Sequence, residues 1–224
     1  TCAKILAKAV NCEHPVNGDP CCQCPSCLGL ESGSFLDVLE LDAASNNGVD
    51  QVRALRDEAI YAPANVKKRV YIVDEVHMLS TAAFNALLKI LEEPPAHLMF
   101  ILATTELHKV PATILSRCQR YSFKRILPKG IARRLTYGAQ QEQIDLTPDG
   151  AELLSRLADG ALRDGLSLLD QCAAAGGTVD SRAVLEVLGL AGNLQTAQLM
   201  RDILDRNAQA ALLLLNELYT GGKD

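Results

Sequence analysis

The stretch Val70-Tyr71-Ile72-Val73-Asp74-Glu75 decides the fold that this sequence predicts. Its first four residues form an unbroken apolar run, which is typical of a strand buried on both faces of a parallel sheet. Asp74 and Glu75 follow at the carboxyl end of that strand, where open α/β sheets bind their ligands. The pair suits Mg²⁺ and a phosphate: Asp74 would hold the water shell of the metal, and Glu75 would polarise an attacking water. The alternative is a strand that simply runs into a polar turn.

Predicted strands and helices alternate around this stretch. Such an alternation is typical of a doubly wound parallel sheet with helices on both faces. The last strand ends in Thr104-Thr105, so polar groups follow two strand ends, as a phosphate site requires. The other predicted elements are a strand with Leu36, Val38, Leu39 and Leu41 that ends in Asp42, a helix over 49–60, a helix over 81–93 with Ser80 as its N-cap, and a strand over 98–103.

Four cysteines, Cys12, Cys21, Cys24 and Cys27, are spaced C-x8-C-x2-C-x2-C in a segment rich in Pro and Gly. Two C-x2-C steps that share Cys24 allow four thiolates to surround one tetrahedral ion. A structural Zn²⁺ site is favoured over disulfides, which require an oxidising compartment. Four protein ligands fill the tetrahedral coordination sphere and leave no open coordination position on the ion, so we do not expect catalysis at this metal. Cys22 competes with Cys21 for the same place in the pattern.

Charge is unevenly distributed along the chain. The net charge of −5 argues against a protein that coats nucleic acid over its whole surface, although local patches remain open. No apolar run approaches the roughly 18 residues of a membrane span, and no signal peptide is visible, so we expect a cytoplasmic protein without a membrane partner. Residues 107–141 hold basic residues and no acids, and a solvated basic face is the alternative to a binding role. These residues are Lys109, Arg117, Arg120, Lys124, Arg125, Lys129, Arg133 and Arg134.

From Lys129 onward the pattern is helical, with a short helix expected over 178–190 and leucine-rich helical sequence over 194–219. Arg163 falls in the first turn of one of these helices, where a cation opposes the helix dipole. This local cost indicates an anionic partner for Arg163, either a nearby acid or a nucleotide phosphate.

Several motifs occur together: Val73–Leu79, Phe84–Lys89 followed by Leu91–Pro95, Thr104-Thr105, Ser116–Cys118, and Leu162–Asp164 followed by Leu168–Asp170. From Thr1 to about Gly192 the sequence resembles the DNA polymerase III gamma/tau family, the AAA+ ATPase subunits of the bacterial sliding-clamp loader. The four-cysteine pattern also looks like the zinc module of that family. The resemblance implies a P-loop NTPase core of the AAA+ class, an α/β fold, followed by an all-α lid.

The resemblance implies a role for each candidate residue. Asp74 looks like the Mg²⁺ ligand of the Walker B pair and Glu75 like its catalytic base. Thr105 is similar to the sensor that contacts the γ-phosphate of ATP or its water. Arg117 looks like a finger donated in trans to the ATP of a neighbouring subunit, and Arg163 like the second sensor in the lid.

One motif of that family is missing from these 224 residues, namely the phosphate-binding loop G-x-x-x-x-G-K-[ST]. The resemblance implies that this loop ends at or just before Thr1 and opens a helix over Thr1–Val10. Thr1 is therefore a candidate nucleotide contact. We expect a protein limited to these residues to have little ATPase activity.

The resemblance also implies the domains and partners. It implies a nucleotide-binding domain over 1–125 with the zinc module at about 12–30, a lid over 126–190, and the start of a C-terminal oligomerisation (collar) domain over 191–224. Expected partners are the other clamp-loader subunits (delta, delta-prime and further gamma/tau copies), the sliding clamp and primer–template DNA. In that family ATP orders a spiral of subunits that opens the clamp and grips DNA, and hydrolysis releases both within the DNA polymerase III holoenzyme.

Two other classes of function remain. A zinc-bearing DNA-binding module without catalysis would account for the cysteines and the basic segment, but not for the acids and Thr105 at strand ends. Another AAA+ DNA-remodelling ATPase, such as a helicase loader or a junction motor, would share the acids. A four-cysteine insertion between the first helix and the following strand is not expected in such a motor.

Overall fold

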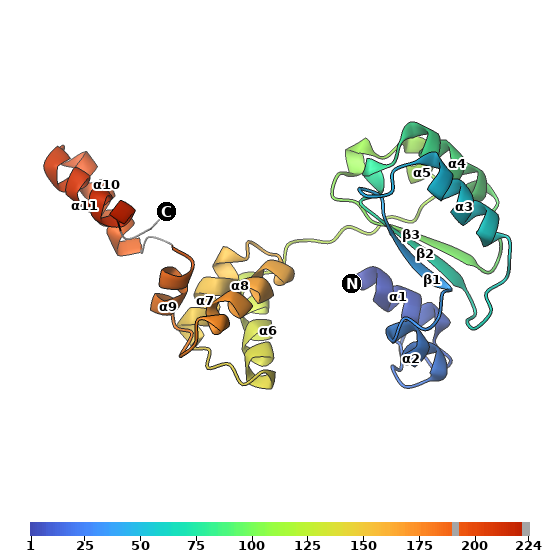
Figure 1. The fold of residues 1–224 in the computed structure, drawn as a ribbon, viewed down its shortest axis with the longest axis horizontal. Coiled ribbons are helices and arrows are strands. Elements are labelled where there is room, and N and C mark those ends of the chain that lie inside the picture. Colours follow the sequence, from blue (N-terminus) through green and yellow to red (C-terminus); the bar gives the residue numbers. More distant parts are fainter. Residues whose placement is uncertain (190–192, 221–224) are drawn as a thin grey trace. The chain divides into compact units, whose positions relative to one another are not determined.

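The computed structural model describes residues 1–189 and 193–220. Residues 190–192 and 221–224, which belong to the ranges predicted for the short helix over 178–190 and for the oligomerisation domain, lie outside the described residues. The chain forms two compact units, Thr1–Tyr121 and Ser122–Asp224 (Figure 1). The finer division into 1–125, 126–190 and 191–224 stays a prediction.

Three parallel strands form the sheet of the first unit: β1 (Val38–Asp42), β2 (Arg69–Asp74) and β3 (Leu98–Leu102), in the order β1-β2-β3. The apolar run of β2 is 3% exposed or less, which confirms that this strand is buried on both faces. The prediction was wrong about Leu36, which lies before β1 and is 87% exposed. Strand pairing begins only where Val38 meets Val70, so the alternation at Leu36 has no partner strand to bury it.

Helices cover both faces of the sheet, and the side chains of β2 alternate between two cores. On one face Val70 and Ile72 pack against Ala7 of α1 (Cys2–Asn11). On the other face Tyr71 and Val73 belong to a larger core. The helices of that core are α3 (Val49–Ala59), α4 (Thr81–Glu92) and α5 (Ala112–Leu115), as Figure 1 shows. The prediction of a doubly wound parallel sheet is confirmed.

Short elements connect the strands to these helices. The 3-10 helix η1 (Val76–Met78) follows β2, and η2 (Leu107–Lys109) follows β3. The Ser80 hydroxyl accepts the N–H of Ala83, as predicted for the N-cap of α4, and so satisfies one of the unpaired amides of its first turn. Helix α2 (Pro25–Glu31) lies within the cysteine-rich segment.

The second unit is helical, as predicted from Lys129 onward. Its first four helices pack around one core that includes the fully buried Ile131, Leu135 and Leu154. Thr147 caps α7, because its hydroxyl accepts the N–H of Gly150. The helices are α6 (Pro128–Gln141), α7 (Pro148–Leu157), α8 (Leu162–Ala174), α9 (Ser181–Val187), α10 (Asn193–Leu204) and α11 (Ala208–Thr220).

Candidate functional site

Acidic residues end two neighbouring strands, β1 and β2. The pairing register places Asp42 beside Asp74, the last residues of these strands. The Asp42 carboxylate accepts the Ser45 hydroxyl at 2.6 Å and the Ala44 N–H at 2.9 Å, and these hydrogen bonds lower its pKa. Asp42 is thus engaged in its own turn. Asp74 is exposed and accepts the N–H of Glu75 at 3.0 Å through Oδ1.

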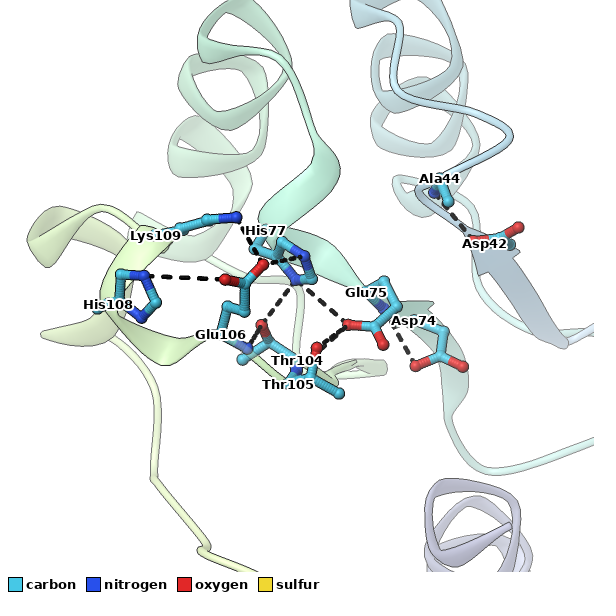
Figure 2. A network of polar contacts seen from close by, with 10 residues as sticks. All are labelled: Asp42, Ala44, Asp74, Glu75, His77, Thr104, Thr105, Glu106, His108 and Lys109. Atoms are coloured by element: carbon cyan, nitrogen blue, oxygen red, sulfur yellow. Dashed lines mark hydrogen bonds and ion pairs between the residues drawn. The ribbon is translucent and has the colours of Figure 1, made fainter. Parts of the chain in front are cut away.

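Glu75 leaves the strand in the left-handed backbone region, with φ 46° and ψ 46°. Its side chain is directed to the end of the next strand, where Oε2 accepts the Thr105 hydroxyl at 3.0 Å and the Thr105 N–H at 3.2 Å. His77 Nδ1 lies 3.2 Å from the same oxygen. Figure 2 shows these three groups meeting at the Glu75 carboxylate. The structure therefore brings together Asp74, Glu75 and Thr105.

The residues behind this carboxylate were not found by sequence reasoning. His77, whose side chain is 7% exposed, lies with Nδ1 3.0 Å from Thr104 Oγ1 and with Nε2 3.2 Å from Glu106 Oε2 (Figure 2). Lys109 Nζ donates to Glu106 at 2.6 Å, and this hydrogen bond is the main cause that lowers the pKa of Glu106. A signal was present in the sequence, because His77 follows the acid pair by two residues and Thr104 precedes Thr105.

The donor set at this edge fits a hydrated Mg²⁺ and a phosphate. Mg²⁺ prefers carboxylate and water oxygens and keeps much of its water shell. Asp74 Oδ2 accepts no hydrogen bond from the described residues, so it is available to such a shell. The Thr105 hydroxyl donates directly to one oxygen of the Glu75 carboxylate and so fixes this side chain, whose other oxygen can accept a hydrogen bond from a water. These groups suit chemistry in which a carboxylate accepts a proton from an attacking water.

Arg117 follows α5. Its Nη2 lies 2.8 Å from Glu92 Oε1, and its Nη1 donates to the Thr113 carbonyl at 2.8 Å. Both side chains of the ion pair are partly exposed. Arg117 is thus held on the surface of its own unit, and in the described residues it has no contact with Asp74 or Glu75.

The other two candidates stand at helix starts. Arg163 occupies the first turn of α8, as predicted, is exposed, and forms no ion pair with the described residues. It belongs to the second unit. Thr1 is the N-cap residue of α1, but its side chain makes no capping hydrogen bond. Its carbonyl accepts the N–H of Ile5.

The four predicted metal ligands meet in one cluster. The sulfurs of Cys12, Cys21, Cys24 and Cys27 all lie within 4.8 Å of one another, and Cys22 lies outside the cluster and is exposed. Backbone N–H groups of Cys21, Cys24 and Cys27 donate to cluster sulfurs at 3.3–3.4 Å. A hydrogen bond from the Glu13 backbone is the main cause that lowers the pKa of Cys24 to about 6, whereas burial raises the pKa of Cys27 to about 12. Sulfur donors in a compact, amide-lined cluster fit a tetrahedral ion.

The fold and the site define a class: an AAA+ domain followed by a helical lid. Among solved structures, Thermotoga maritima RuvB, a Holliday junction branch migration motor, is similar with a TM-score of 0.58. The two chains are 16% identical, and the match covers 84% of this chain and 68% of the RuvB chain, so the likeness shows the fold alone. Residues 1–126 match the family described as DNA polymerase III, delta subunit, and residues 130–178 match the DNA polymerase III clamp loader subunit, ATPase lid domain. The first match covers more than half of the chain, which therefore belongs to this family of DNA polymerase III clamp-loader subunits.

Curated relatives confirm the resemblance to the gamma/tau family. The DNA polymerase III subunit tau of Bacillus subtilis is 50% identical over 223 residues, 99% of this chain and 40% of that protein. The tau subunit of Escherichia coli is 43% identical over 221 residues, 98% of this chain and 34% of that protein. The chain thus spans at most two fifths of the length of these relatives. Among the described residues, no helix combines the length and apolar character needed to cross a membrane.

Proposed function

We propose that this chain is the nucleotide-handling part of a clamp-loader ATPase subunit, which couples ATP hydrolysis to the loading of a sliding clamp onto primed DNA. The observation that carries the proposal is the junction of Glu75 with Thr105 at the carboxyl edge of the sheet, 3.0 Å apart. An acid after the central strand that is held by a hydroxyl after the neighbouring strand suits the activation of a water that attacks a phosphate. The names of the relatives supply the context of DNA replication.

Each residue at this edge has a task in the proposed mechanism. Asp74 would hold Mg²⁺ through water, and the metal would supply neutralising charge to the phosphates of ATP. Glu75 accepts the proton of the attacking water. The hydroxyl and N–H of Thr105 fix one oxygen of Glu75, and the same hydroxyl can contact the γ-phosphate or its water.

Three further residues would complete the site. Arg117 would reach the ATP of an adjoining subunit after it exchanges Glu92 for a phosphate, because a guanidinium pairs with either anion. Arg163 would contact nucleotide from the helical unit, and its lack of an acidic partner in the described residues supports this role. Thr1, at the start of α1, would lie where a helix N-terminus favours phosphate.

The cysteine cluster would hold a structural Zn²⁺ through Cys12, Cys21, Cys24 and Cys27. The metal would order a segment that is poor in other apolar contacts, since the small core there consists of the cysteines themselves. The proposed partners are the delta, delta-prime and further gamma/tau subunits, the sliding clamp and primer–template DNA, in the cytoplasm.

The test is Glu75→Gln in a clamp loader assembled from subunits that contain this chain together with a phosphate-binding loop. We expect ATP turnover to fall by about 10²–10⁴-fold, because a neutral amide cannot accept a proton, while nucleotide binding persists. Glu93→Gln, an exposed acid at the end of α4, is the matched control and should behave as wild type. Clamp loading by Glu75→Gln at the wild-type rate would contradict the proposal, and intact DNA binding without any ATP dependence would favour a non-catalytic module.

A further inference from the structure

His77 is a nearly buried, ionisable side chain for which the proposed function has no task so far. It lies in η1, two residues after Glu75, and its ring separates two carboxylates. Nδ1 lies 3.2 Å from Glu75 Oε2, and Nε2 lies 3.2 Å from Glu106 Oε2. The side chain is 7% exposed, so the ring is held by its surroundings and is not a mobile surface group.

Within the described part of the chain, the contacts around the Glu75 carboxylate involve only one of its two oxygens. The Thr105 hydroxyl, the Thr105 N–H and the His77 ring all meet Oε2. No hydrogen bond to Oε1 is formed within residues 1–189 and 193–220. Because three groups fix one oxygen, the other is left to face water, and the Glu75 side chain is 35% exposed. The oxygen that would accept a proton is therefore Oε1, and the groups on Oε2 determine where it points.

The ring is itself oriented from its far side. His77 Nε2 lies 3.2 Å from Glu106 Oε2, and Lys109 Nζ donates a hydrogen bond to the same oxygen at 2.6 Å (Figure 2). Thr104 Oγ1 accepts the Glu106 N–H at 3.0 Å and lies 3.0 Å from Nδ1, so it ties the acid and the ring to one loop. Only Nδ1 reaches Glu75. Because each ring nitrogen faces a carboxylate, the ring donates to both acids only when both nitrogens carry a hydrogen, with Nδ1–H toward Glu75 and Nε2–H toward Glu106.

We propose that His77 is a positioning residue for the hydrolytic step: through Nδ1 it holds Oε2 of Glu75 and so directs Oε1 at the attacking water. This inference deepens the proposed function and rests on it. His77 does not touch the reacting atoms, and its effect is on the geometry of Glu75. Misplacement of a catalytic group lowers the rate of the chemical step more than it weakens substrate binding.

The two ring nitrogens can be tested separately. The amide of Asn at position 77 reproduces the Nδ1 side of the ring, which faces Glu75, whereas the longer Gln reproduces Nε2, which faces Glu106. We expect His77→Asn to keep kcat within about threefold of wild type, and His77→Gln to lose about tenfold or more in kcat with KM for ATP unchanged. A purely structural role would not distinguish the two amides in this order.

The matched control is the neighbouring His108, whose side chain is 75% exposed and has no contact with Glu75. His108→Asn and His108→Gln should both turn over ATP as wild type does. All variants are measured in the assembled clamp loader, and circular dichroism melting checks their folding. Should His77→Gln fail to fold, His77→Ala replaces it, because it removes the Nδ1 contact with Glu75 altogether. A lowered kcat in His77→Ala beside a retained kcat in His77→Asn then supports the proposal, and equal kcat in the two variants overturns it.

Glu75→Gln runs beside these variants and separates the two ideas. Loss of turnover in Glu75→Gln together with the Asn-over-Gln order at position 77 supports both. Loss in Glu75→Gln with equal, wild-type kcat in both His77 variants overturns the positioning role and leaves the proposed function standing. Wild-type turnover in Glu75→Gln overturns the proposed function and the role of His77 with it.

Discussion

Arg117 and Glu92 form an ion pair on the surface of the first unit, with Nη2 2.8 Å from Oε1. Both side chains remain partly exposed, at 35% and 53%. A pair of this kind contributes only about 0–1 kcal/mol to stability, so Arg117 can exchange its partner at small cost. Arg117, which is proposed to reach a neighbouring subunit, is thus kept in place by a weak ion pair that it can give up.

The first prediction concerns this arginine. Arg117→Ala should lower ATP turnover of the assembled clamp loader by about 10³-fold, because the positive charge offered to a neighbouring phosphate is lost. Adding Arg117→Ala subunits to wild-type ones should lower turnover at neighbouring sites, which steady-state ATPase assays on mixed assemblies can measure. Arg53→Ala is the control, since Arg53 also pairs with an exposed acid, Asp50. Equal turnover in the Arg117 and Arg53 variants would refute a role in trans.

The second prediction separates the hydroxyl of Thr105 from its backbone. Thr105→Val removes the donor at 3.0 Å from Glu75 but keeps the N–H contact and the side-chain shape. A hydrogen bond to a charged group contributes about 1.5–3 kcal/mol, so kcat should fall by about tenfold or more, whereas Thr105→Ser should stay near wild type. Single-turnover hydrolysis measures the step directly. Equal rates in Val and Ser variants would show that the hydroxyl has no part in hydrolysis.

The third prediction concerns the cysteine cluster. Cys24→Ser should lower the zinc content of the purified protein, measured by plasma mass spectrometry, because one of four clustered sulfurs is removed. Structural zinc sites bind with about 10–16 kcal/mol, so chelation should also lower the melting temperature of the wild-type protein. Cys22→Ser is the matched control, since Cys22 is exposed and outside the cluster. Zinc loss in Cys22→Ser and not in Cys24→Ser would reverse the ligand assignment.

The fourth prediction concerns stability against pH in the helical unit. Hydrogen bonds from Ser181 and Thr147 hold the pKa of Asp149 well below its ordinary value of 3.8, and the Ser181 N–H donates to Oδ2 at 3.0 Å. Because the folded pKa is depressed, the stabilisation is present above pH 3.8 and is lost as the pH falls toward the folded value. Asp149→Asn should therefore melt below wild type at pH 7, with a gap that narrows on acidification below about pH 4.

Thermal melts from pH 7 to pH 2 measure this gap. Asp170→Asn on α8 is the control, because Asp170 is exposed and accepts no hydrogen bond from the described residues. Its melting curve should follow wild type throughout. A gap for Asp149→Asn that stays constant with pH would show that the carboxylate charge is not the cause.

The elements of the fold could be predicted where the signal is local. The run before Asp74 is apolar without a break because both faces of β2 are covered, and Ser80 marks α4 because its hydroxyl caps the helix in the structure. The cysteine spacing likewise predicted the cluster in which the four sulfurs meet. The prediction that Leu36 belongs to the strand was wrong. The end of a strand depends on where a partner strand is available, and the alternation of apolar residues in one segment does not contain that information.

The candidate site was predictable only in part. Asp74, Glu75 and Thr105 follow strand ends, so the parallel sheet alone brings them to one edge. The contacts of His77 with Glu106, and of Arg117 with Glu92, join loops and helices far apart in the chain. Such partners are selected by tertiary packing, and no periodicity or capping signal in either segment encodes the choice.

Glu75 occupies a left-handed backbone conformation immediately after β2, an arrangement uncommon for any residue with a side chain. In a regular strand two successive side chains point to opposite faces, so adjacent acids would have separate surroundings. The left-handed conformation of Glu75 interrupts this alternation of faces, so the Glu75 side chain is directed toward the end of the next strand. Replacement of Glu75 by a β-branched residue would therefore strain the main chain as well as remove the carboxylate, whereas Gln tests the charge alone.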